Sequence, residues 1–199
     1  MTEREKMLGG MLYNPADKEL RAMQRRVRAL TEKYNRAEPE DRPAIMREIL
    51  GGCGEHFYFE PAVRFDYGVN TFIGEHFYAN FNMTILDCAK VCIGRDVMCG
   101  PNVTLATPVH PLLIEDRKMR MSADGEWFDY EYAKPITIED GAWLASCVTV
   151  NGGVTIGKNS VIGSGSVVTR DIPAGVFAAG APCRVIRKLT EQDKMNLPE

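Results

Sequence analysis

Two hydrophobic patterns follow one another along the chain. Over residues 17–36, apolar side chains recur every three or four positions, good helix formers dominate, and glycine and proline do not occur. This pattern predicts one amphipathic helix. Its buried stripe is predicted to hold Leu20, Met23, Val27, Leu30 and Tyr34. A second, short helix is predicted to follow Pro43 and to end at Gly51 and Gly52, because proline suits a first helical turn and glycine suits the end of a helix.

From about Glu60 a six-residue step replaces the helical one, and aliphatic residues recur along two ladders. Such a period predicts short strands stacked as coils, whose ladder side chains share one continuous core. A β-sandwich is disfavoured because its turns would lie about 8 to 12 residues apart. Glycine often follows a ladder position, as at Gly74 and Gly163, where a sharp corner leaves no room for a Cβ atom. The first ladder consists of Ile73, Ala79, Ile85, Val91, Val97, Val103 and Val109, and the second of Ile138, Leu144, Val150, Ile156, Ile162 and Val168.

The six-residue step breaks once, and the break predicts an extruded loop over residues 110–135. Its aromatic residues indicate that the loop packs on another part of the molecule, and long insertions of this kind are usually functional or disordered. The run from Asp171 to Gly175 is predicted to close the ladders. We therefore expect a mainly β chain with a helical segment over residues 1–55, a parallel β-helix over residues 56–188 and a tail over residues 189–199.

Composition narrows the class of protein. The 199 residues are 45% hydrophobic, which is enough for one real core. A net charge of -3 provides no basic field for nucleic acid. The charged N-terminus and the lack of a long apolar run predict a cytoplasmic chain without membrane contact. Six cysteines show no paired metal-ligand spacing, so no metal site is predicted, and each cysteine is expected to be a small buried hydrophobe.

Three motifs resemble the hexapeptide-repeat O-acetyltransferases of the maltose, galactoside and nodulation type. They are the run Asn80-Phe81-Asn82, the His110-Pro111 pair at the repeat break, and the segment over residues 178–186 with the sequence AAGAPCRVI. The resemblance covers nearly the whole chain. It implies a left-handed β-helix, a homotrimer with active sites between neighbouring prisms, and direct transfer of an acetyl group from acetyl-CoA to a hydroxyl of a small sugar.

Acetyl transfer to an alcohol needs a base, and histidine is suited to this task because its ordinary pKa lies near neutrality. Of the three histidines, only His110 lies at the repeat break and matches the family's catalytic position, whereas His56 and His76 are expected to be ordinary residues. The resemblance assigns Asn80 as the hydrogen-bond donor to the oxyanion. Glu131 is the candidate acid that would hold the imidazole in the productive tautomer.

The resemblance also assigns the residues that bind the two substrates. For acetyl-CoA it implies Asn80, Ser146, Ser164, Thr169, Arg170, Arg184 and Arg187, the arginines being suited to nucleotide phosphates. For the acceptor it implies Asp17, Tyr78 and Asp87. A helix-capping role competes for Asp17. Galactoside enzymes carry a second acidic residue after Asp87, where this chain has Cys88, and a preference for galactosides is therefore in doubt.

Three alternatives stay open on sequence grounds. A scaffold β-helix without a bound cofactor would have no use for His110 or the arginines. A zinc-dependent hydratase would need three histidines that converge on the metal, and the spacing of His56, His76 and His110 makes this convergence improbable. The third alternative is an acetyltransferase for another acceptor, such as an amine, an antibiotic or serine. The antibiotic group shares the repeats and the histidine but usually lacks the N-terminal helical segment.

Overall fold

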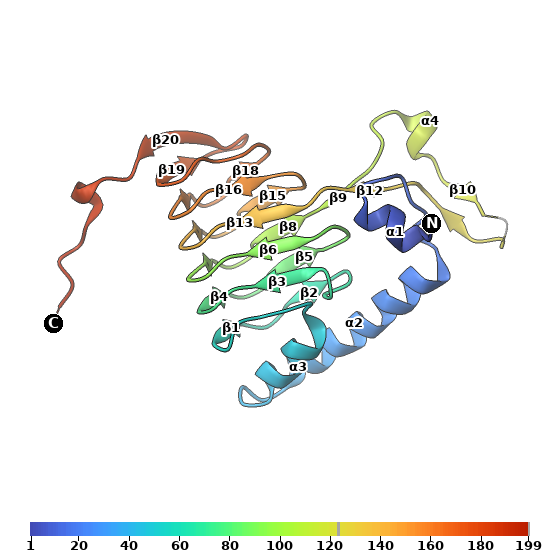
Figure 1. Ribbon diagram of the computed structural model, residues 1–199, viewed down its shortest axis with the longest axis horizontal. Coiled ribbons are helices and arrows are strands. Elements are labelled where there is room, and N and C mark those ends of the chain that lie inside the picture. Colours follow the sequence, from blue (N-terminus) through green and yellow to red (C-terminus); the bar gives the residue numbers. More distant parts are fainter. Residues whose placement is uncertain (123, 199) are drawn as a thin grey trace.

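The computed structural model describes residues 1–122 and 124–198. Positions 123 and 199, which belong to the predicted loop and the predicted tail, lie outside the described residues. Three helices precede a three-sided prism of short parallel strands, with a projecting extension on one side and the C-terminal segment leaving at one end (Figure 1). The helices are α1 (Glu3–Leu8), α2 (Lys18–Arg36) and α3 (Arg42–Ile49).

Each face of the prism is a sheet to which successive coils contribute one strand each. Face 1 contains β3 (Thr71–Ile73), β6 (Val91–Ile93), β13 (Ile136–Ile138) and β16 (Thr155–Ile156). Face 2 contains β1 (Phe57–Phe59), β4 (Phe77–Ala79), β7 (Met98–Cys99), β14 (Trp143–Leu144), β17 (Val161–Ile162), β19 (Val176–Ala179) and β20 (Arg184–Lys188). Face 3 contains β2 (Arg64–Phe65), β5 (Thr84–Leu86), β8 (Thr104–Ala106), β15 (Thr149–Asn151) and β18 (Val167–Val168). The chain runs from face 1 to face 2 to face 3, which defines corners 1/2, 2/3 and 3/1.

The second predicted ladder is confirmed, whereas the first divides between two columns. Ile138 stacks on Ile156, which gives a coil of 18 residues. Ile73 stacks on Ile93, a coil of 20 residues, and Val91 stacks on Thr71 instead. A coil of 20 residues exceeds three six-residue steps by two residues. A shift of two residues keeps a side chain on the same face of its strand, so the ladder residues stay inside although they stack on a different residue of the next coil. The ladder residues are buried, and none is more than 5% exposed except Val109, which lies outside the coil in β9.

The N-terminal helices cover one end of the prism and share its core. Asp17 caps α2, accepting hydrogen bonds from the backbone amides of Glu19 (2.9 Å) and Leu20 (3.3 Å). At its other end, the Tyr34 hydroxyl donates to the Phe59 carbonyl oxygen at 2.6 Å. Val27 and Tyr34 pack in the same apolar cluster as the inward residues of the coils. Residues 1–55 therefore have no separate core, and the helices shield the apolar first coil from water.

The segment predicted as an extruded loop contains regular structure. β9 (Pro108–Val109) pairs antiparallel with β12 (Tyr132–Ala133), and β10 (Arg120–Met121) pairs antiparallel with β11 (Trp127–Phe128). The short helix α4 (Ile114–Arg117) lies between β9 and β10 in the chain. Phe128 is buried, and its ring meets that of Tyr130 edge-on with centroids 5.1 Å apart. Phe128 and Tyr130 thus pack on each other, whereas Trp127 is 55% exposed, and the segment is a hairpin extension that strand pairing holds in place.

The stack of strands continues beyond the run from Asp171 to Gly175, where the ladders were predicted to close, and stays within the range predicted for the β-helix. β19 pairs parallel with β17, so the stack continues past the predicted end at Gly175 to Ala178. The chain then turns back as β20, which pairs antiparallel with β19 and ends the stack. The 3-10 helix Glu191–Asp193 follows, in the segment that leaves the prism (Figure 1). Within residues 1–122 and 124–198, no helix is long and apolar enough to cross a membrane.

Candidate active site

His110 leaves the prism at corner 3/1, directly after β9, and meets an acidic residue of the returning segment between β11 and β12. Its Nδ1 atom lies 2.9 Å from Oδ2 of Asp129, and the imidazole is 45% exposed. The pairing of β9 with β12 brings these two positions together. A carboxylate at Nδ1 favours the proton on that nitrogen, so Nε2 keeps a lone pair that can accept a proton.

Glu131 does not make the contact that the sequence predicts, because Asp129 occupies that place. One carboxylate oxygen of Glu131, Oε2, instead accepts a hydrogen bond from the Tyr13 hydroxyl at 2.7 Å. Glu131 still offers a carboxylate oxygen within 4.8 Å of the His110 and Asp129 ligand atoms. Burial raises the pKa of Glu131, while the Tyr13 hydrogen bond and the nearby His110 oppose that rise. The His110 imidazole therefore has two carboxylates nearby: Asp129 is in contact with it, and Glu131 lies farther away.

A buried polar cluster lies behind Glu131 and includes Asp87. Asp87 is 0% exposed. Its Oδ1 accepts from the Tyr67 amide at 2.9 Å, and its Oδ2 accepts from the Thr71 hydroxyl at 3.0 Å. Burial raises the pKa of this carboxyl. The predicted acceptor-binding role of Asp87 is thus corrected, since its side chain serves to hold corner 3/1 and does not reach the surface.

Half-buried Asp66 and buried Cys88 adjoin this cluster. Burial, with the charge of Asp87 second, raises the pKa of Asp66 to about 6. The Cys88 thiol donates to Oδ2 of Asp66 at 3.6 Å, and the residue is 3% exposed. All six cysteines are free thiols, but Cys147 is exposed and Cys53 and Cys92 are half-buried. The prediction that each cysteine is buried therefore holds for Cys88, Cys99 and Cys183.

A groove runs along corner 2/3 and collects several of the predicted substrate-binding residues. It has a volume of about 300 Å³, and its lining includes Tyr78, Asn80, Ser146 and Ser164. The Asn80 side-chain oxygen accepts from the Phe81 amide at 2.7 Å, so the amide NH₂ group remains available to donate. The sequence did not single out Trp143, which lines the same groove with its indole 49% exposed.

A second hollow adjoins the His110 partner. It has a volume of about 420 Å³ and lies between the start of α2 and the hairpin extension. Pro15 and Ala16, which precede Asp17, line it together with Trp127 and Asp129. One oxygen of Asp17 caps α2, so the competing structural role is present. The hollow also contains arginines from α2, namely Arg21, Arg25 and Arg28.

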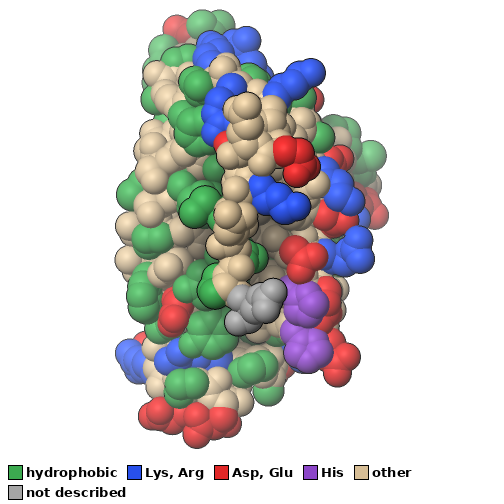
Figure 2. Space-filling model, turned by 90° about the vertical axis from the view of Figure 1, so that its left-hand side faces the viewer, with side chains coloured by type: hydrophobic (Ala, Val, Ile, Leu, Met, Phe, Trp, Pro, Cys, Tyr) green, Lys and Arg blue, Asp and Glu red, His purple; other side chains and the backbone are tan. Residues whose placement is uncertain are grey.

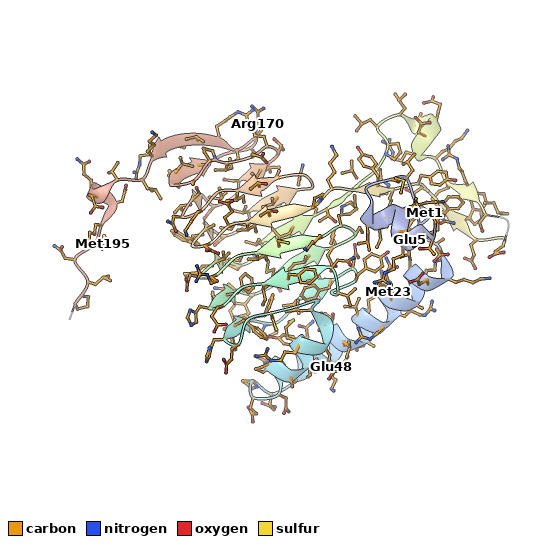
Figure 3. All side chains as sticks on the ribbon, in the orientation of Figure 1. Met1, Glu5, Met23, Glu48, Arg170 and Met195 are labelled. Carbon is orange, nitrogen blue, oxygen red and sulfur yellow. The ribbon has the colours of Figure 1, made fainter. Side chains whose placement is uncertain are left out.

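The remaining predicted cofactor residues lie toward the C-terminal end of the prism. Thr169 and Arg170 are exposed at corner 3/1, and Figure 3 shows Arg170 projecting from that end. Arg184 is exposed in β20 and donates to the Cys183 carbonyl oxygen at 2.8 Å. Arg187 forms two hydrogen bonds with the Asp193 carboxylate. Its guanidinium therefore already binds an anion.

The predicted catalytic residues lie at different corners of one chain. Asn80 follows β4 and lies at corner 2/3, whereas His110 follows β9 and lies at corner 3/1. His56 and His76, expected to be ordinary residues, lie together at corner 1/2 with ring centroids 5.9 Å apart. Two histidines therefore converge, but His110 is not with them. The His110–Asp129 pair and the groove that holds Asn80 therefore lie on different edges of the prism.

Known proteins share this architecture. Residues 6–54 match the maltose acetyltransferase hexapeptide capping motif, and residues 135–170 match the bacterial transferase hexapeptide model of six repeats. The galactoside O-acetyltransferase of Escherichia coli K12 is 44% identical over 98% of this chain and 92% of its own length. A maltose O-acetyltransferase from Clostridium difficile 630 superimposes with a TM-score of 0.89 at 41% identity, covering 96% of this chain and 99% of its own.

A galactoside acetyltransferase solved in complex with coenzyme A also gives a TM-score of 0.89 at 41% identity, over 100% of this chain and 96% of its own. The chain belongs to the hexapeptide-repeat sugar O-acetyltransferase family, and it is an acetyl-CoA-dependent acyltransferase with the left-handed β-helix fold.

Proposed function

We propose that this enzyme transfers an acetyl group from acetyl-CoA to a hydroxyl of a small sugar, with His110 as the general base. The observation that carries the proposal is the His110–Asp129 contact of 2.9 Å, because Asp129 also lines the hollow of about 420 Å³ between α2 and the hairpin extension. The names of the relatives, which act on galactosides and maltose, support a sugar acceptor. Ligand sites for small molecules commonly have volumes of about 300 to 1,000 Å³, and the hollow lies within this range.

In the proposed reaction, His110 Nε2 removes the proton from the acceptor hydroxyl as the oxygen attacks the thioester carbon. The carbonyl oxygen becomes an oxyanion, and the Asn80 amide donates a hydrogen bond to it. Collapse of the tetrahedral intermediate breaks the carbon–sulfur bond, and the imidazolium returns the proton to the departing thiolate. Asp129 stabilises the imidazolium by contact, and Glu131 contributes its charge from a greater distance.

The proposed active site needs two copies of the chain. Asn80, Ser146 and Ser164 lie along corner 2/3, whereas His110 lies at corner 3/1. The outward side chains of face 2 also form an apolar column that includes Tyr58, Met98 and Trp143, which are 36%, 51% and 49% exposed. A second copy would cover such a column, and the family's trimeric arrangement would place the groove of one protomer against the His110 of its neighbour.

The substrates are assigned to these surfaces as follows. The pantetheine arm would lie along the groove at corner 2/3, where small serines leave the backbone accessible and Trp143 adds an apolar wall. Arg170, Arg184 and Arg187 would bind the nucleotide phosphates, with Thr169 beside them. The acceptor would lie next to Asp17 and Asp129, with Tyr78 reaching it from the neighbouring protomer.

Release of the free thiol from acetyl-CoA tests the proposal when it is followed with a panel of acceptors. The panel includes glucose, maltose, a galactoside, chitin fragments, serine and a streptogramin-like alcohol. Turnover with a sugar is the expected result. Turnover with only serine or the antibiotic, or binding of acetyl-CoA without turnover of any sugar, would contradict the proposed sugar acceptor.

A further inference from the structure

Two histidines stack at corner 1/2, on an edge of the prism that the proposed reaction does not use. His56 directly precedes β1, and His76 occupies the equivalent position one 20-residue coil later, with its amide donating to the His56 carbonyl oxygen at 2.7 Å. Their side chains are 70% and 62% exposed. Figure 2 shows two histidine side chains side by side on this part of the surface, with acidic side chains around them.

Two carboxylates orient the pair. Oε1 of Glu75 lies 2.6 Å from Nδ1 of His56 and 3.8 Å from Nε2 of His76. On the next coil, Oδ1 of Asp96 lies 3.1 Å from Nδ1 of His76. Glu75 is itself fixed, because it accepts hydrogen bonds from the backbone amides of Glu55 and His56. The hydrogen bond with His56 is the main reason that the pKa of Glu75 is lowered.

We propose that His56, His76 and Glu75 bind a divalent transition-metal ion such as Zn²⁺. One ligand atom from each of the three residues lies within 4.8 Å of the others, so a single ion can reach all of them. Imidazole and carboxylate are the ligand types that such ions prefer. Asp96 holds the His76 ring by its Nδ1 atom, as carboxylates hold metal-binding histidines in many proteins, and the other ring nitrogen is left for the metal.

The charge around the site also suits a dication. Glu75 and Asp96 carry two negative charges beside two imidazoles, and the nearby Arg95 is engaged by Asp140 at 3.2 Å. A bound ion would join the start of β1 to the corner between β3 and β4. It would thereby hold together the first two coils, next to the end that the helices cover. An ion that binds only the folded chain stabilises it in proportion to the logarithm of its concentration.

His110, Asp129 and Glu131 form a second group of comparable size, but Tyr13 engages Glu131 and the group belongs to the proposed active site. It therefore provides the control. His76 has a φ of 56°, a left-handed conformation that Asn82, Asn102 and Asn159 adopt at other turns of the prism. The variant His76→Asn should consequently remove a ligand and leave the backbone unchanged.

The test is calorimetric titration of ZnCl₂ into chelator-treated protein without a polyhistidine tag. We expect one ion per chain in the wild type, a rise in Tm with zinc, loss of both in His56→Ala and His76→Asn, and unchanged acetyl transfer in these variants. Asp96→Asn should weaken binding by about 10 to 100-fold, and His110→Ala should bind zinc as the wild type does. Retention of zinc by His76→Asn, its loss in His110→Ala, or no binding by the wild type would overturn the proposal.

Discussion

Tyr13 and Glu131 are 118 positions apart and are joined twice. The tyrosine hydroxyl donates to Oε2 of the carboxylate at 2.7 Å, and their backbones form an antiparallel bridge. Tyr13 is 0% exposed, so its ring anchors this contact in the apolar cluster that also holds Leu20 and Ala133. The N-terminal segment thus fixes the strand that brings Asp129 to His110.

Tyr13→Phe should remove the hydroxyl and keep the packing of the ring. The Glu131 pKa should then rise further, because the hydrogen bond that lowers it is lost. We expect kcat to fall by about tenfold and the acid limb of the kcat profile to move to higher pH. The KM for acetyl-CoA should not change. A uniform loss of activity at every pH would indicate a purely structural role for Tyr13.

His110→Ala should lower kcat by roughly 100 to 10,000-fold, the usual contribution of a general base, with acetyl-CoA binding retained. If Asp129 acts only through the imidazole, Asp129→Asn should lower kcat in the wild type and cause no further loss in the His110→Ala background. Glu131→Gln is the matched comparison and should cost less than Asp129→Asn. A larger loss of kcat in Glu131→Gln than in Asp129→Asn would indicate that Glu131, and not Asp129, orients the imidazole.

Arg184→Ala should raise the KM for acetyl-CoA by about tenfold and leave kcat nearly unchanged, because a phosphate contact acts on binding. Steady-state kinetics at saturating acceptor measures this effect. The same substitution should not alter KM for acetyl-pantetheine, which has no nucleotide. A change in the acceptor KM alone would contradict the cofactor assignment.

Asp193→Asn should lower the KM for acetyl-CoA. The two hydrogen bonds from Arg187 hold the pKa of Asp193 at about 2, so at neutral pH the carboxylate competes with a phosphate for the same guanidinium. Removal of that charge frees Arg187. Arg187→Ala and the double variant should both show a raised KM, and an unchanged KM in all three variants would place Arg187 outside the cofactor site.

Asp66→Asn should stabilise the protein at neutral pH. The folded pKa of about 6 exceeds the ordinary value near 3.9, so folding favours the protonated form. The contribution of Asp66 to stability is complete below pH of about 4 and is lost as the pH rises through 6. Urea titrations should show the variant to be more stable by about 1 to 2 kcal/mol at pH 7 and equal at pH 4. A constant difference would exclude titration of Asp66 as the cause.

The periodicity of the sequence determined much of the fold. Steps of three and four residues predicted α2, which begins one residue after its capping Asp17, and the six-residue step predicted the stacked coils. Both patterns show which side chains are buried, because the local geometry of a helix or strand decides which positions share one face. The motif resemblance pointed to His110 and to Asn80, Ser146 and Ser164, which the structure places at two corners of the prism.

Tertiary structure alone decided which distant residues meet. The 20-residue coil brings His56 beside His76, and the pairing of β9 with β12 places Asp129 at His110 while Tyr13 takes Glu131. The tertiary structure also buries Asp87, which was predicted to bind the acceptor. Such contacts depend on coil length, strand register and the path of the extension. The repeat in the sequence indicates whether a side chain points into the core or out of it. Which residues from distant parts of the chain touch at a corner is decided only when the coils stack.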